Sequence, residues 1–519
     1  MEWSKYQQAV FTEAARLTDE DCAVVARAGC AKTTSLIESL RTVPYHRVLL
    51  SAFNKSIQVE MQNRAPRHVH CRTLHSLGLR IHQDNLQLHN RGRAEVVPEK
   101  GREMAMKLLE EKPQYYRGGN QAFAGDYERK IDAVVALRKT TSFAKNVLAL
   151  EHDELLDIAN NCDLPSREDA DKIARAAAEL LNREADDYLR VDFDDMAWFP
   201  WMFEYGVADG THMPDYDVVM VDERQDTSPA QDWMIEQIAR SGRTISFLDD
   251  RQCIYGFRGV DRATVERIVK NANVVKLPLP VSYRCPLAVI EKARLVVPDI
   301  EPAPNAEDGH VELTEYDDLL DNARVGDFIL SRTNAPLMAT CLRLLQQGMP
   351  AVVAGRDIGE SLRKLLKRSK AKTIPDLHRF LQVWLTKEHK RFIPEYPNKY
   401  ERSQDRAACL DAVSRFCQTP REVDEWLQRM FSDAEPTDLI VCSTVHKAKG
   451  LERDRVWMLS ATFGYPNVKP WQDAWSEENI WYVAVTRAHK ELYFVETPLD
   501  EMGTRSTVDN RRQRQVDWR

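Results

Sequence analysis

A chain of 519 residues with 43% hydrophobic and 29% charged residues has the composition of a folded protein with several domains, which excludes a mostly disordered chain. The 72 Lys and Arg residues against 80 Asp and Glu residues give a formal net charge of −8, which excludes a histone-like coating protein but allows a local phosphate-binding groove. The first residues, MEWSKYQQAV, do not resemble a signal peptide, and no run approaches the roughly 18 apolar residues of a membrane helix. We expect a cytoplasmic protein, or a nuclear one if the source is eukaryotic.

Short apolar or β-branched runs recur along the chain, and each is followed by a polar turn and a helical pattern. Strands that are apolar throughout and separated by helices are typical of parallel sheets covered on both faces. The sequence therefore predicts an α/β protein. The expected strands are Ala23–Ala26, Val48–Ala52, Val218–Asp222, Thr244–Leu248, Phe328–Ser331, Leu439–Ser443, Val456–Ser460 and Leu492–Val495.

These strands fall into two sets, and a segment with helical periodicity interrupts each set. Amphipathic patterns occur at Glu103–Lys112, Arg129–Lys139 and Ala170–Ala185 in the first interruption, and at Ser361–Lys370 and Pro375–Thr386 in the second. We therefore expect two α/β cores, each carrying a mainly helical insertion. The expected parts are the first core at 1–85 and 191–275, its insertion at 86–190, the second core at 276–360 and 436–500, its insertion at 361–435, and a basic tail at 501–519.

The first expected strand leads into a short loop of small residues, followed by Lys32, Thr33 and a helix. This order is that of a phosphate-binding P-loop, in which backbone N–H groups and the helix N-terminus face phosphate oxygens. Lys32 is expected to reach the β- and γ-phosphates of ATP, and the Thr33 hydroxyl is expected to hold Mg²⁺. The residues expected to surround the nucleotide are Ala28, Gly29, Cys30, Ala31, Lys32, Thr33 and Thr34.

Two alanines depart from the usual P-loop pattern. Glycine is usual at the positions of Ala26 and Ala31, and alanine adds a methyl group and restricts positive φ angles. Weaker nucleotide binding, or a changed preference among nucleotides, would follow. The alternative interpretation is a small-residue turn before a core helix, with no nucleotide.

A pair of carboxylates follows the expected strand at 218–222. Asp222 and Glu223 come at the carboxyl end of this strand, which we expect to be the neighbour of the P-loop strand. Asp222 would complete the Mg²⁺ shell, and Glu223 would polarise the attacking water as a general base. A pair that only caps the next helix is the alternative, and the P-loop upstream weakens it.

The segment DERQD at 222–226 resembles motif II of superfamily 1 DNA helicases of the UvrD/PcrA/Rep group, and other segments resemble the remaining motifs in the same order. The segments AFNK at 52–55 and TLHS at 73–76 are similar to the phage and F-box branch of that group. The resemblance implies two RecA-like P-loop cores with parallel sheets, each with a helical insertion. It also implies ATP and Mg²⁺ as cofactors, and single-stranded DNA and single/double-strand junctions as partners.

The resemblance assigns further residues to the nucleotide. Gln7 matches the Q motif, which reads adenine, and Gln252 matches the γ-phosphate sensor of motif III. Tyr283 and Arg284 match motif IV, whose tyrosine packs on the base and whose arginine reaches the γ-phosphate. Both Arg284 and the arginine finger are expected in the second core, so that ATP would bridge two cores. The residues of motifs V and VI assigned to the nucleotide are Glu452 and, as arginine finger, Arg487.

A protein that binds single-stranded DNA without reading its sequence needs aromatic side chains that stack on the bases and polar side chains that contact the phosphates. Phe53, Tyr255 and Phe257 are the expected stacking platforms, with core packing as the alternative for Phe53 and Phe257. The remaining residues expected to contact DNA are Asn54, Thr73, His75, Arg258, Thr444 and His446.

Three departures from the family pattern are visible. Arg251 stands where an acidic residue is common, and Phe257 stands where tryptophan is common. The second insertion is much shorter than in UvrD or PcrA, which puts any duplex-binding role of this region in question.

The leading interpretation is an ATP-dependent DNA helicase or translocase that moves 3′→5′ and acts in replication, recombination or repair. One alternative is a DNA-binding translocase or remodelling factor whose ATPase is weak or lost through Ala26 and Ala31. The motor part of a helicase–nuclease and an RNA helicase are others. The segment after the last expected strand is too short for a fused nuclease, and the segments DERQD and YVAVTRA favour the DNA group.

Overall fold

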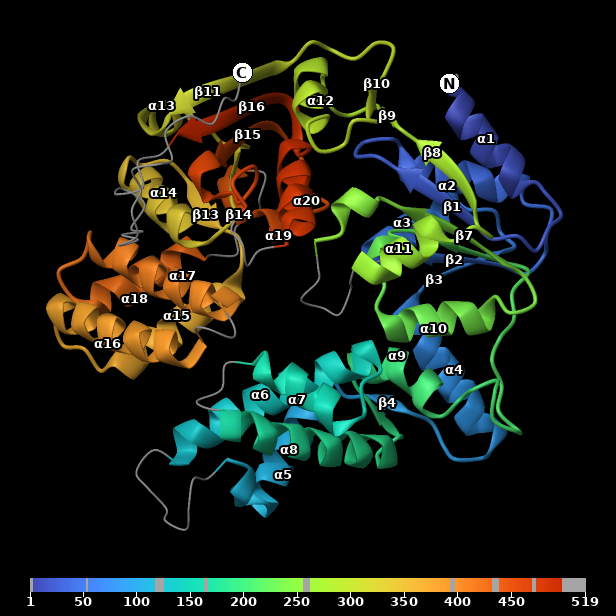
Figure 1. The fold of residues 1–519 in the computed structure, drawn as a ribbon, viewed down its shortest axis with the longest axis horizontal. Helices are drawn as coiled ribbons and strands as arrows, with labels where there is room; N and C mark the ends of the chain where they lie inside the picture. Colours follow the sequence, from blue (N-terminus) through green and yellow to red (C-terminus); the bar gives the residue numbers. More distant parts are fainter. Residues whose placement is uncertain are drawn as a thin grey trace. The chain divides into compact units, whose positions relative to one another are not determined.

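The computed structural model describes residues 3–52, 55–116, 126–162, 167–254, 262–392, 397–431, 438–468 and 473–496. The chain forms two compact units, each described by itself (Figure 1). Unit 1 comprises Met1–Arg284 and Asp299–Ala303, and unit 2 comprises Cys285–Pro298 and Pro304–Arg519. Among the described residues, no helix combines the length and the apolar character needed to cross a bilayer.

Unit 1 is built on a six-stranded parallel sheet in the order β3-β2-β6-β7-β1-β8. Its four inner strands are almost wholly buried, because helices cover both faces of the sheet. The strands are β1 (Cys22–Ala26), β2 (Val48–Ala52), β3 (Val69–Thr73), β6 (Val218–Val221), β7 (Arg243–Leu248) and β8 (Val275–Leu279).

The side chains of alternate strand residues join two different hydrophobic clusters. Val24, Leu50 and Phe247 pack with α1, α2 and α3, whereas Leu49 and Val219 pack with α4 and α10. This alternation is the period of two of a β-strand, and it assigns the helices to opposite faces. The elements around the sheet are α1 (Lys5–Ala14), α2 (Lys32–Thr42), α3 (Lys55–Arg64), α4 (Leu74–Leu88), α10 (Pro229–Ile238), α11 (Arg262–Lys270), β9 (Val281–Ser282) and β10 (Glu301–Pro302).

A bundle of helices between β3 and β6 has its own hydrophobic cluster. It joins the sheet layer through α9, which packs on α4. At Gly78 of α4, a Cβ would lie 1.8 Å from the carbonyl oxygen of Met196, so this close helix contact requires glycine. The elements of the bundle are β4 (Glu95–Val96), α5 (Lys100–Glu111), a 3₁₀ turn (Pro113–Tyr115), α6 (Asp126–Val147), α7 (His152–Asn160), α8 (Arg167–Asp186), β5 (Arg190–Val191) and α9 (Phe193–Met202).

Two lysines and three carboxylates meet inside this bundle. Lys100 Nζ donates to Asp195 Oδ2 at 2.9 Å, and Lys145 Nζ donates to Asp195 Oδ1 at 2.6 Å. Lys145 Nζ also lies 2.9 Å from Glu184 Oε2 and 3.5 Å from Asp192 Oδ2. Lys100, Glu184 and Asp195 are all fully buried, so opposite charges compensate one another away from water.

Unit 2 contains a second six-stranded parallel sheet, in the order β11-β16-β15-β12-β14-β13. Its inner strands are again largely buried, whereas the edge strand β11 is mostly exposed. The strands are β11 (His310–Glu315), β12 (Phe328–Ser331), β13 (Ala351–Val353), β14 (Ile440–Thr444), β15 (Arg453–Leu459) and β16 (Ala488–Glu496). The helices next to them in sequence are α12 (Leu287–Ala293), α13 (Tyr316–Asn322), α14 (Ala335–Gln346), α19 (Val445–Ala448) and α20 (Ala474–Val485).

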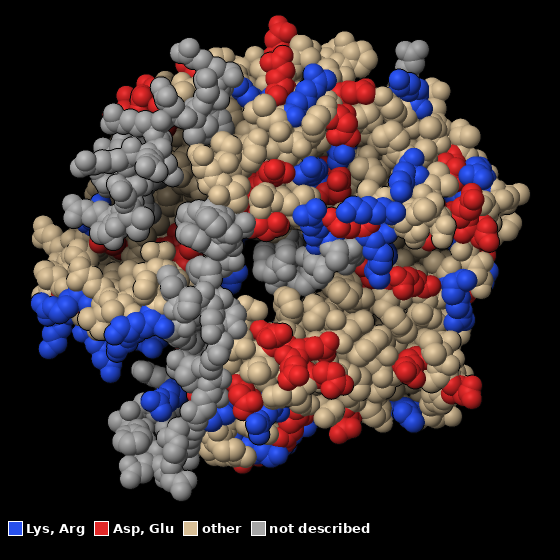
Figure 2. Space-filling view, viewed as in Figure 1, with Lys and Arg blue, Asp and Glu red and all other residues tan. Residues whose placement is uncertain are grey.

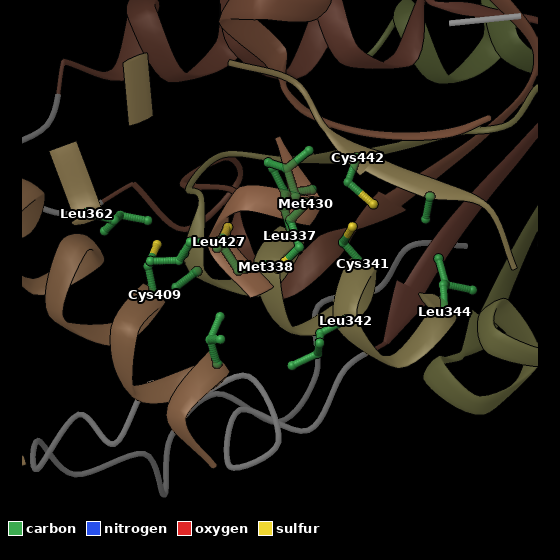
Figure 3. Close-up of a cluster of buried hydrophobic side chains, with 14 of the residues drawn as sticks. Leu337, Met338, Cys341, Leu342, Leu344, Leu362, Cys409, Leu427, Met430 and Cys442 are labelled. Carbon is green, nitrogen blue, oxygen red and sulfur yellow. The ribbon is translucent and has the colours of Figure 1, made fainter. Parts of the chain in front are cut away.

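Four further helices of unit 2 share one hydrophobic cluster with α14 and the sheet (Figure 3). In this cluster the sulfur atoms of Cys341, on α14, and Cys442, on β14, point toward one another. Asp405, on the third of these helices, connects that helix to α14, because its Oδ1 accepts from the backbone N–H groups of Asn334 and Ala335 at 3.0 and 2.9 Å, at the start of α14. The helices are α15 (Arg356–Ser369), α16 (Ile374–Phe392), α17 (Pro397–Ser414) and α18 (Pro420–Met430).

The structure confirms the predicted α/β class with two parallel-sheet cores and helical segments. All eight expected strands are present, and they are the inner strands of the two sheets. One difference concerns the expected division at 275/276, because β8 begins at Val275 and pairs with β1 in unit 1. A second concerns Arg284, which the structure groups with unit 1 and not with the second core.

Candidate functional site: a P-loop with paired carboxylates

The P-loop connects β1 to α2 through two residues with left-handed backbone angles. Gly29 has a φ of +73°, and a Cβ at this position would lie 2.5 Å from Arg284 Cβ, so only glycine fits. Ala31 has a φ of 56°, and it caps α2 without a side-chain hydrogen bond. Alanine in this region costs roughly 1–2 kcal/mol, a cost that the usual glycine would avoid. Ala26, by contrast, lies within the extended strand β1.

Lys32 and the two carboxylates predicted to accompany it lie together at the carboxyl edge of the unit 1 sheet. Lys32 Nζ forms an ion pair with Glu223 Oε1 and lies 3.8 Å from Asp222 Oδ1. Burial lowers the pKa of Lys32, but Glu223 and Asp222 raise it further, so the net pKa is raised and the ammonium stays charged. Burial raises the pKa of Asp222 to about 6, against the opposing charge of Lys32.

The strand that carries these carboxylates is not the neighbour of the P-loop strand. β7 lies between β6 and β1, so the expectation that the two strands are adjacent is wrong. The side chains still meet, because all three strands end at the same edge and Lys32 reaches across β7. Glu223 itself has a φ of 50°, an uncommon angle for a non-glycine residue and one that is typical of functional turns.

The residues that would hold Mg²⁺ offer oxygen atoms of the kind this ion prefers. Asp222 contributes a buried carboxylate, and Thr33 a hydroxyl on the first turn of α2. Hard oxygen donors of this type fit Mg²⁺, which binds one or two carboxylates together with substrate phosphates. Thr34 also lies on this turn, where its hydroxyl accepts a long hydrogen bond of 3.5 Å from Arg64.

A chain of hydrogen bonds leads from Glu223 to Gln252. Gln225 Nε2 donates to Glu223 Oε2, and Gln225 Oε1 accepts from the backbone N–H of Asp249 at 3.1 Å. Asp249 Oδ2 in turn accepts from Gln252 Nε2 at 2.8 Å. Gln225 and Asp249 are absent from the residues assigned from the sequence, although Gln225 lies inside the DERQD segment and Asp249 directly follows β7.

Arg27 links the P-loop to the same region and was also missed. Its Nη1 lies 2.5 Å from Asp250 Oδ1 and 3.5 Å from Asp249 Oδ1, and its Nη2 lies 2.8 Å from Asp299 Oδ2. Burial raises the pKa of Asp249 to about 6, although the Arg27 charge opposes this shift. A basic residue among the small residues of the loop is the signal that could have identified Arg27.

Gln7 and Tyr283 lie together in unit 1. Gln7 Nε2 donates to Ser35 Oγ at 3.0 Å, and Gln7 Oε1 accepts from the backbone N–H of Ser4 at 3.1 Å and from Tyr283 Oη at 3.4 Å. The backbone N–H of Tyr283 donates to the Gly29 carbonyl at 2.8 Å, and its side chain is exposed. An exposed ring tied to both Gln7 and the P-loop is suitably placed to cover a nucleobase. The loop residues Ala28 and Cys30 are buried, and burial raises the pKa of Cys30 to about 12.

Unit 2 carries the residues predicted from motifs V and VI. Arg487 is 1% exposed, and its guanidinium donates to the carbonyl of Val483 at 2.8 Å, to that of Leu451 at 3.4 Å and to Thr486 Oγ1 at 3.2 Å. Glu452 Oε2 lies 2.7 Å from His489 Nε2. The predicted arginine finger therefore has hydrogen-bond partners within its own unit.

The residues predicted to contact DNA divide into two groups. Thr73 caps α4 by accepting from the Ser76 N–H at 3.2 Å, and His75 follows on the same helix, where burial lowers its pKa. In unit 2, Thr444 precedes α19 and His446 lies on it. Each pair thus lies where a strand, β3 or β14, ends at the carboxyl edge of its sheet, since Thr73 and Thr444 are the last residues of these strands. The predicted residues Phe53, Asn54, Tyr255, Phe257 and Arg258 lie outside the described residues, as does the basic tail.

Comparison with protein families finds two matches that together cover most of the chain. The UvrD/REP helicase N-terminal domain matches residues 7–273, and the UvrD-like helicase C-terminal domain matches residues 422–497. The first match alone covers slightly more than half of the chain and includes Gln7, Lys32, Asp222 and Gln252. The second includes Glu452 and Arg487.

Three curated relatives have sequence similarity to this chain. "F-box DNA helicase protein 1" of Schizosaccharomyces pombe is 22% identical over an alignment of 508 residues that covers 91% of this chain and 55% of the relative. "ATP-dependent DNA helicase HMI1, mitochondrial" of Saccharomyces cerevisiae is 24% identical over 63% of this chain and 50% of the relative. "RecBCD enzyme subunit RecB" of Mycolicibacterium smegmatis is 40% identical over 82 residues, which are 15% of this chain and 7% of that subunit. The chain thus spans about half the length of the first two relatives.

Proposed function

Because the chain belongs to the UvrD/REP helicase family, we propose that it is an ATP-dependent DNA helicase or translocase that moves 3′→5′ on single-stranded DNA. The observation that carries the proposal is the meeting of Lys32, Asp222 and Glu223 at the P-loop. We propose that the protein acts in DNA replication, recombination or repair. It would therefore be located in the cytoplasm of a prokaryotic cell or the nucleus of a eukaryotic one.

Hydrolysis of ATP needs charge neutralised on the transferring phosphoryl group and a water held in line with it. Lys32 binds the β- and γ-phosphates, and Glu223 polarises the water as general base. The Lys32–Glu223 ion pair must open for both to act, since the ammonium then turns from the carboxylate to the phosphates. Thr33 and Asp222 would hold Mg²⁺, which would supply further charge neutralisation at the phosphates.

The remaining residues assigned to the nucleotide recognise its base or respond to its phosphates. Gln7 reads adenine, Tyr283 covers the base, and Gln252 responds to the γ-phosphate. Arg284 and Arg487 stabilise the charge of the transition state, and Glu452, in unit 2, contacts the nucleotide. Because residues of both units respond to one nucleotide, the nucleotide state shifts the protein between two hinge states. The units bind the DNA strand in alternation, and the hinge motion then moves the protein along the strand.

Contacts with DNA are proposed on both units. Phe53, Tyr255 and Phe257 stack on bases, while Asn54, Thr73, His75, Arg258, Thr444 and His446 contact the strand. A basic surface on α15, α16 and the turn between them supports contact with the duplex arm of a junction, and Figure 2 shows Lys and Arg side chains gathered at these helices. Its exposed members are Lys364, Lys367, Arg368, Lys370, Lys372, Arg379, Lys387 and Lys390.

The test is strand separation on duplexes that carry a 3′ or a 5′ single-stranded overhang, with and without ATP. Unwinding of the 3′-tailed duplex alone, and only with ATP, is the expected result. Equal unwinding of both substrates would contradict the polarity, and unwinding without ATP would contradict the motor.

A second candidate is a DNA-binding translocase or remodelling factor with a weak or lost ATPase. Ala31 favours this second function, because an alanine with left-handed backbone angles is strained. That strain opposes the loop conformation that would hold the nucleotide. ATPase assays with and without single-stranded DNA separate the two functions. If the strain limits turnover, Ala31→Gly raises the rate, whereas an unchanged negligible rate in both proteins favours the second candidate.

A further inference from the structure

Gln225 is a fully buried glutamine that uses both ends of its amide at the proposed catalytic site. It lies in the 3₁₀ turn Arg224–Asp226 that follows β6, and it is 0% exposed. Its Nε2 donates to Glu223 Oε2, and its Oε1 accepts from the Asp249 backbone N–H at 3.1 Å. One side chain therefore joins the ends of two neighbouring strands, β6 and β7.

Asp249 extends this connection to two other parts of the site. Its Oδ1 accepts from the backbone N–H of Arg251 at 3.1 Å, and its Oδ2 accepts from Gln252 Nε2 at 2.8 Å. Its Oδ1 also lies 3.5 Å from Arg27 Nη1, on the P-loop. Because Asp249 is 1% exposed, solvent does not compete for these contacts.

We infer that Gln225 is a positioning residue that fixes the orientation of Glu223 and ties it to the γ-phosphate-sensing turn around Gln252. This inference rests on the proposed function, since it assigns Gln225 an action on ATP hydrolysis. Gln225 holds one carboxylate oxygen of Glu223 while Lys32 pairs with the other. When Lys32 turns to the phosphates, Gln225 keeps Glu223 from following it.

The chemistry of the site explains why an amide is needed. The carboxylate of Glu223 requires a donor, and the N–H of Asp249 requires an acceptor. A carboxamide supplies one of each, at opposite ends of a planar group. A misplacement of a reacting group by about 1 Å costs on the order of 10²-fold in rate, so the support of Glu223 matters as much as its presence.

The first measurement separates turnover from binding in the full-length chain. Gln225→Met keeps the length of the side chain and removes the amide, and Gln225→Asn keeps the amide but shortens its reach. We expect each to lower the kcat of DNA-stimulated ATP hydrolysis at least about tenfold, while the Kd of a fluorescent ADP analogue changes less than about twofold. Gln87→Leu, on the exposed side of α4, is the matched control and leaves both values unchanged.

The second measurement is a double-mutant cycle with Glu223→Gln, followed by single-turnover hydrolysis of radiolabelled ATP. If Gln225 acts through Glu223, then Gln225→Met changes the residual rate of the Glu223→Gln protein less than about twofold. A general loss of structure would instead reduce the rate by the same factor in both backgrounds, and that result would overturn the inference. A kcat within twofold of wild type in both Gln225 variants would overturn it as well.

Wild-type protein assayed in parallel distinguishes a failure of the proposed function from a failure of the role assigned to Gln225. No DNA-stimulated ATPase in the wild type contradicts the proposed function and the inference with it. An active wild type with unaffected Gln225 variants contradicts only the role of Gln225.

Discussion

Lys32 and Glu223 form an ion pair in the structure, so each is the other's partner until phosphate oxygens compete for the ammonium. Lys32→Ala removes the charge that would contact the phosphates, and it leaves Asp222 and Glu223 without this cation. We expect DNA-stimulated ATP turnover to fall by roughly 10²-fold or more. The steady-state rate with saturating single-stranded DNA measures this, and Lys107→Ala, exposed on α5, is the control. Near-normal turnover in Lys32→Ala would refute the assignment of the P-loop.

Arg487 has a structural role that the sequence does not reveal. Its guanidinium donates three hydrogen bonds to groups of its own unit, two of them to backbone carbonyls. Arg487→Ala leaves those buried acceptors without their donor, so we expect the free energy of unfolding to fall by about 2–4 kcal/mol. Thermal unfolding of the intact chain measures this loss.

The same substitution also tests the proposed arginine finger. At a temperature where the Arg487→Ala protein remains folded, a lowered kcat with an unchanged Kd for ADP would support the finger. Arg487→Lys keeps the charge without the planar fork of donors, and we expect it to recover part of the stability. A variant with wild-type stability would show that the hydrogen bonds of Arg487 contribute little.

At the residue scale, the sequence predicts the types of side chains in the site better than their connections. Lys32, Asp222 and Glu223 stand out because each combines a charge with a fixed position after a strand. Gln225 does not stand out, because its role depends on the Asp249 N–H, which is brought near by the pairing of β6 and β7. A contact of this kind exists only after the sheet has formed, so spacing along the chain does not reveal it.

At the scale of elements, the buried charges of the α5–α9 bundle make its stability depend on pH. Burial raises the pKa of Glu184 to about 7, with Lys145 opposing the shift and Asp195 and Asp192 adding to it. The ordinary value is 4.5, so between these two pH values the folded state binds a proton that the unfolded state releases. The stabilising contribution is complete below 4.5 and is lost as the pH rises through about 7.

We therefore expect the intact protein to become less stable between pH 5 and pH 8 by up to about 3 kcal/mol through this group. Glu184→Gln carries the neutral form permanently and should flatten that dependence. Calorimetric melting at several pH values measures both proteins, and Glu110→Gln, at an exposed site on α5, is the control. Parallel pH dependence in wild type and Glu184→Gln would show that Glu184 does not bind the extra proton.

The strands that the sequence analysis found and missed differ in their place in the sheets. The eight expected strands are all inner strands, which are apolar throughout because helices cover both of their faces. Of the strands in the two six-stranded sheets, the four missed ones, β3, β8, β11 and β13, are the two edges of each sheet. The two-residue strands β4, β5, β9 and β10, which pair outside these sheets, were not expected either. β11 is mostly exposed, and β8 alternates exposed and partly buried residues, so neither presents a continuous apolar run.

At the scale of the whole molecule, the basic surface of α15 and α16 is expected to decide how DNA with a duplex arm is held. The triple variant Lys364→Glu, Lys367→Glu, Arg368→Glu should weaken binding of a 3′-tailed duplex at least about tenfold. The slope of log K against log salt concentration should also become shallower by about 3, because fewer counterions are released. Fluorescence anisotropy across salt concentrations measures both.

Stimulation of ATPase by short single-stranded DNA should survive in this triple variant, since the basic surface is proposed to face the duplex arm. Lys490→Glu, at another exposed site of unit 2, is the control for a Lys-to-Glu replacement outside the basic surface. Equal weakening for single-stranded and tailed DNA would contradict the proposed division of contacts.

The edge strands also bear on how this protein behaves when it is concentrated. An unpaired strand edge is a template on which another chain can add a strand. β8 ends the unit 1 sheet with the exposed residues Lys276 and Pro278, and proline has no backbone N–H to offer an incoming strand. β11 ends the unit 2 sheet with His310, Glu312, Leu313 and Glu315 exposed, and three of these four side chains are polar or charged. The side chains that hide these strands from a search for apolar runs thus also discourage the edge-to-edge association from which aggregates grow.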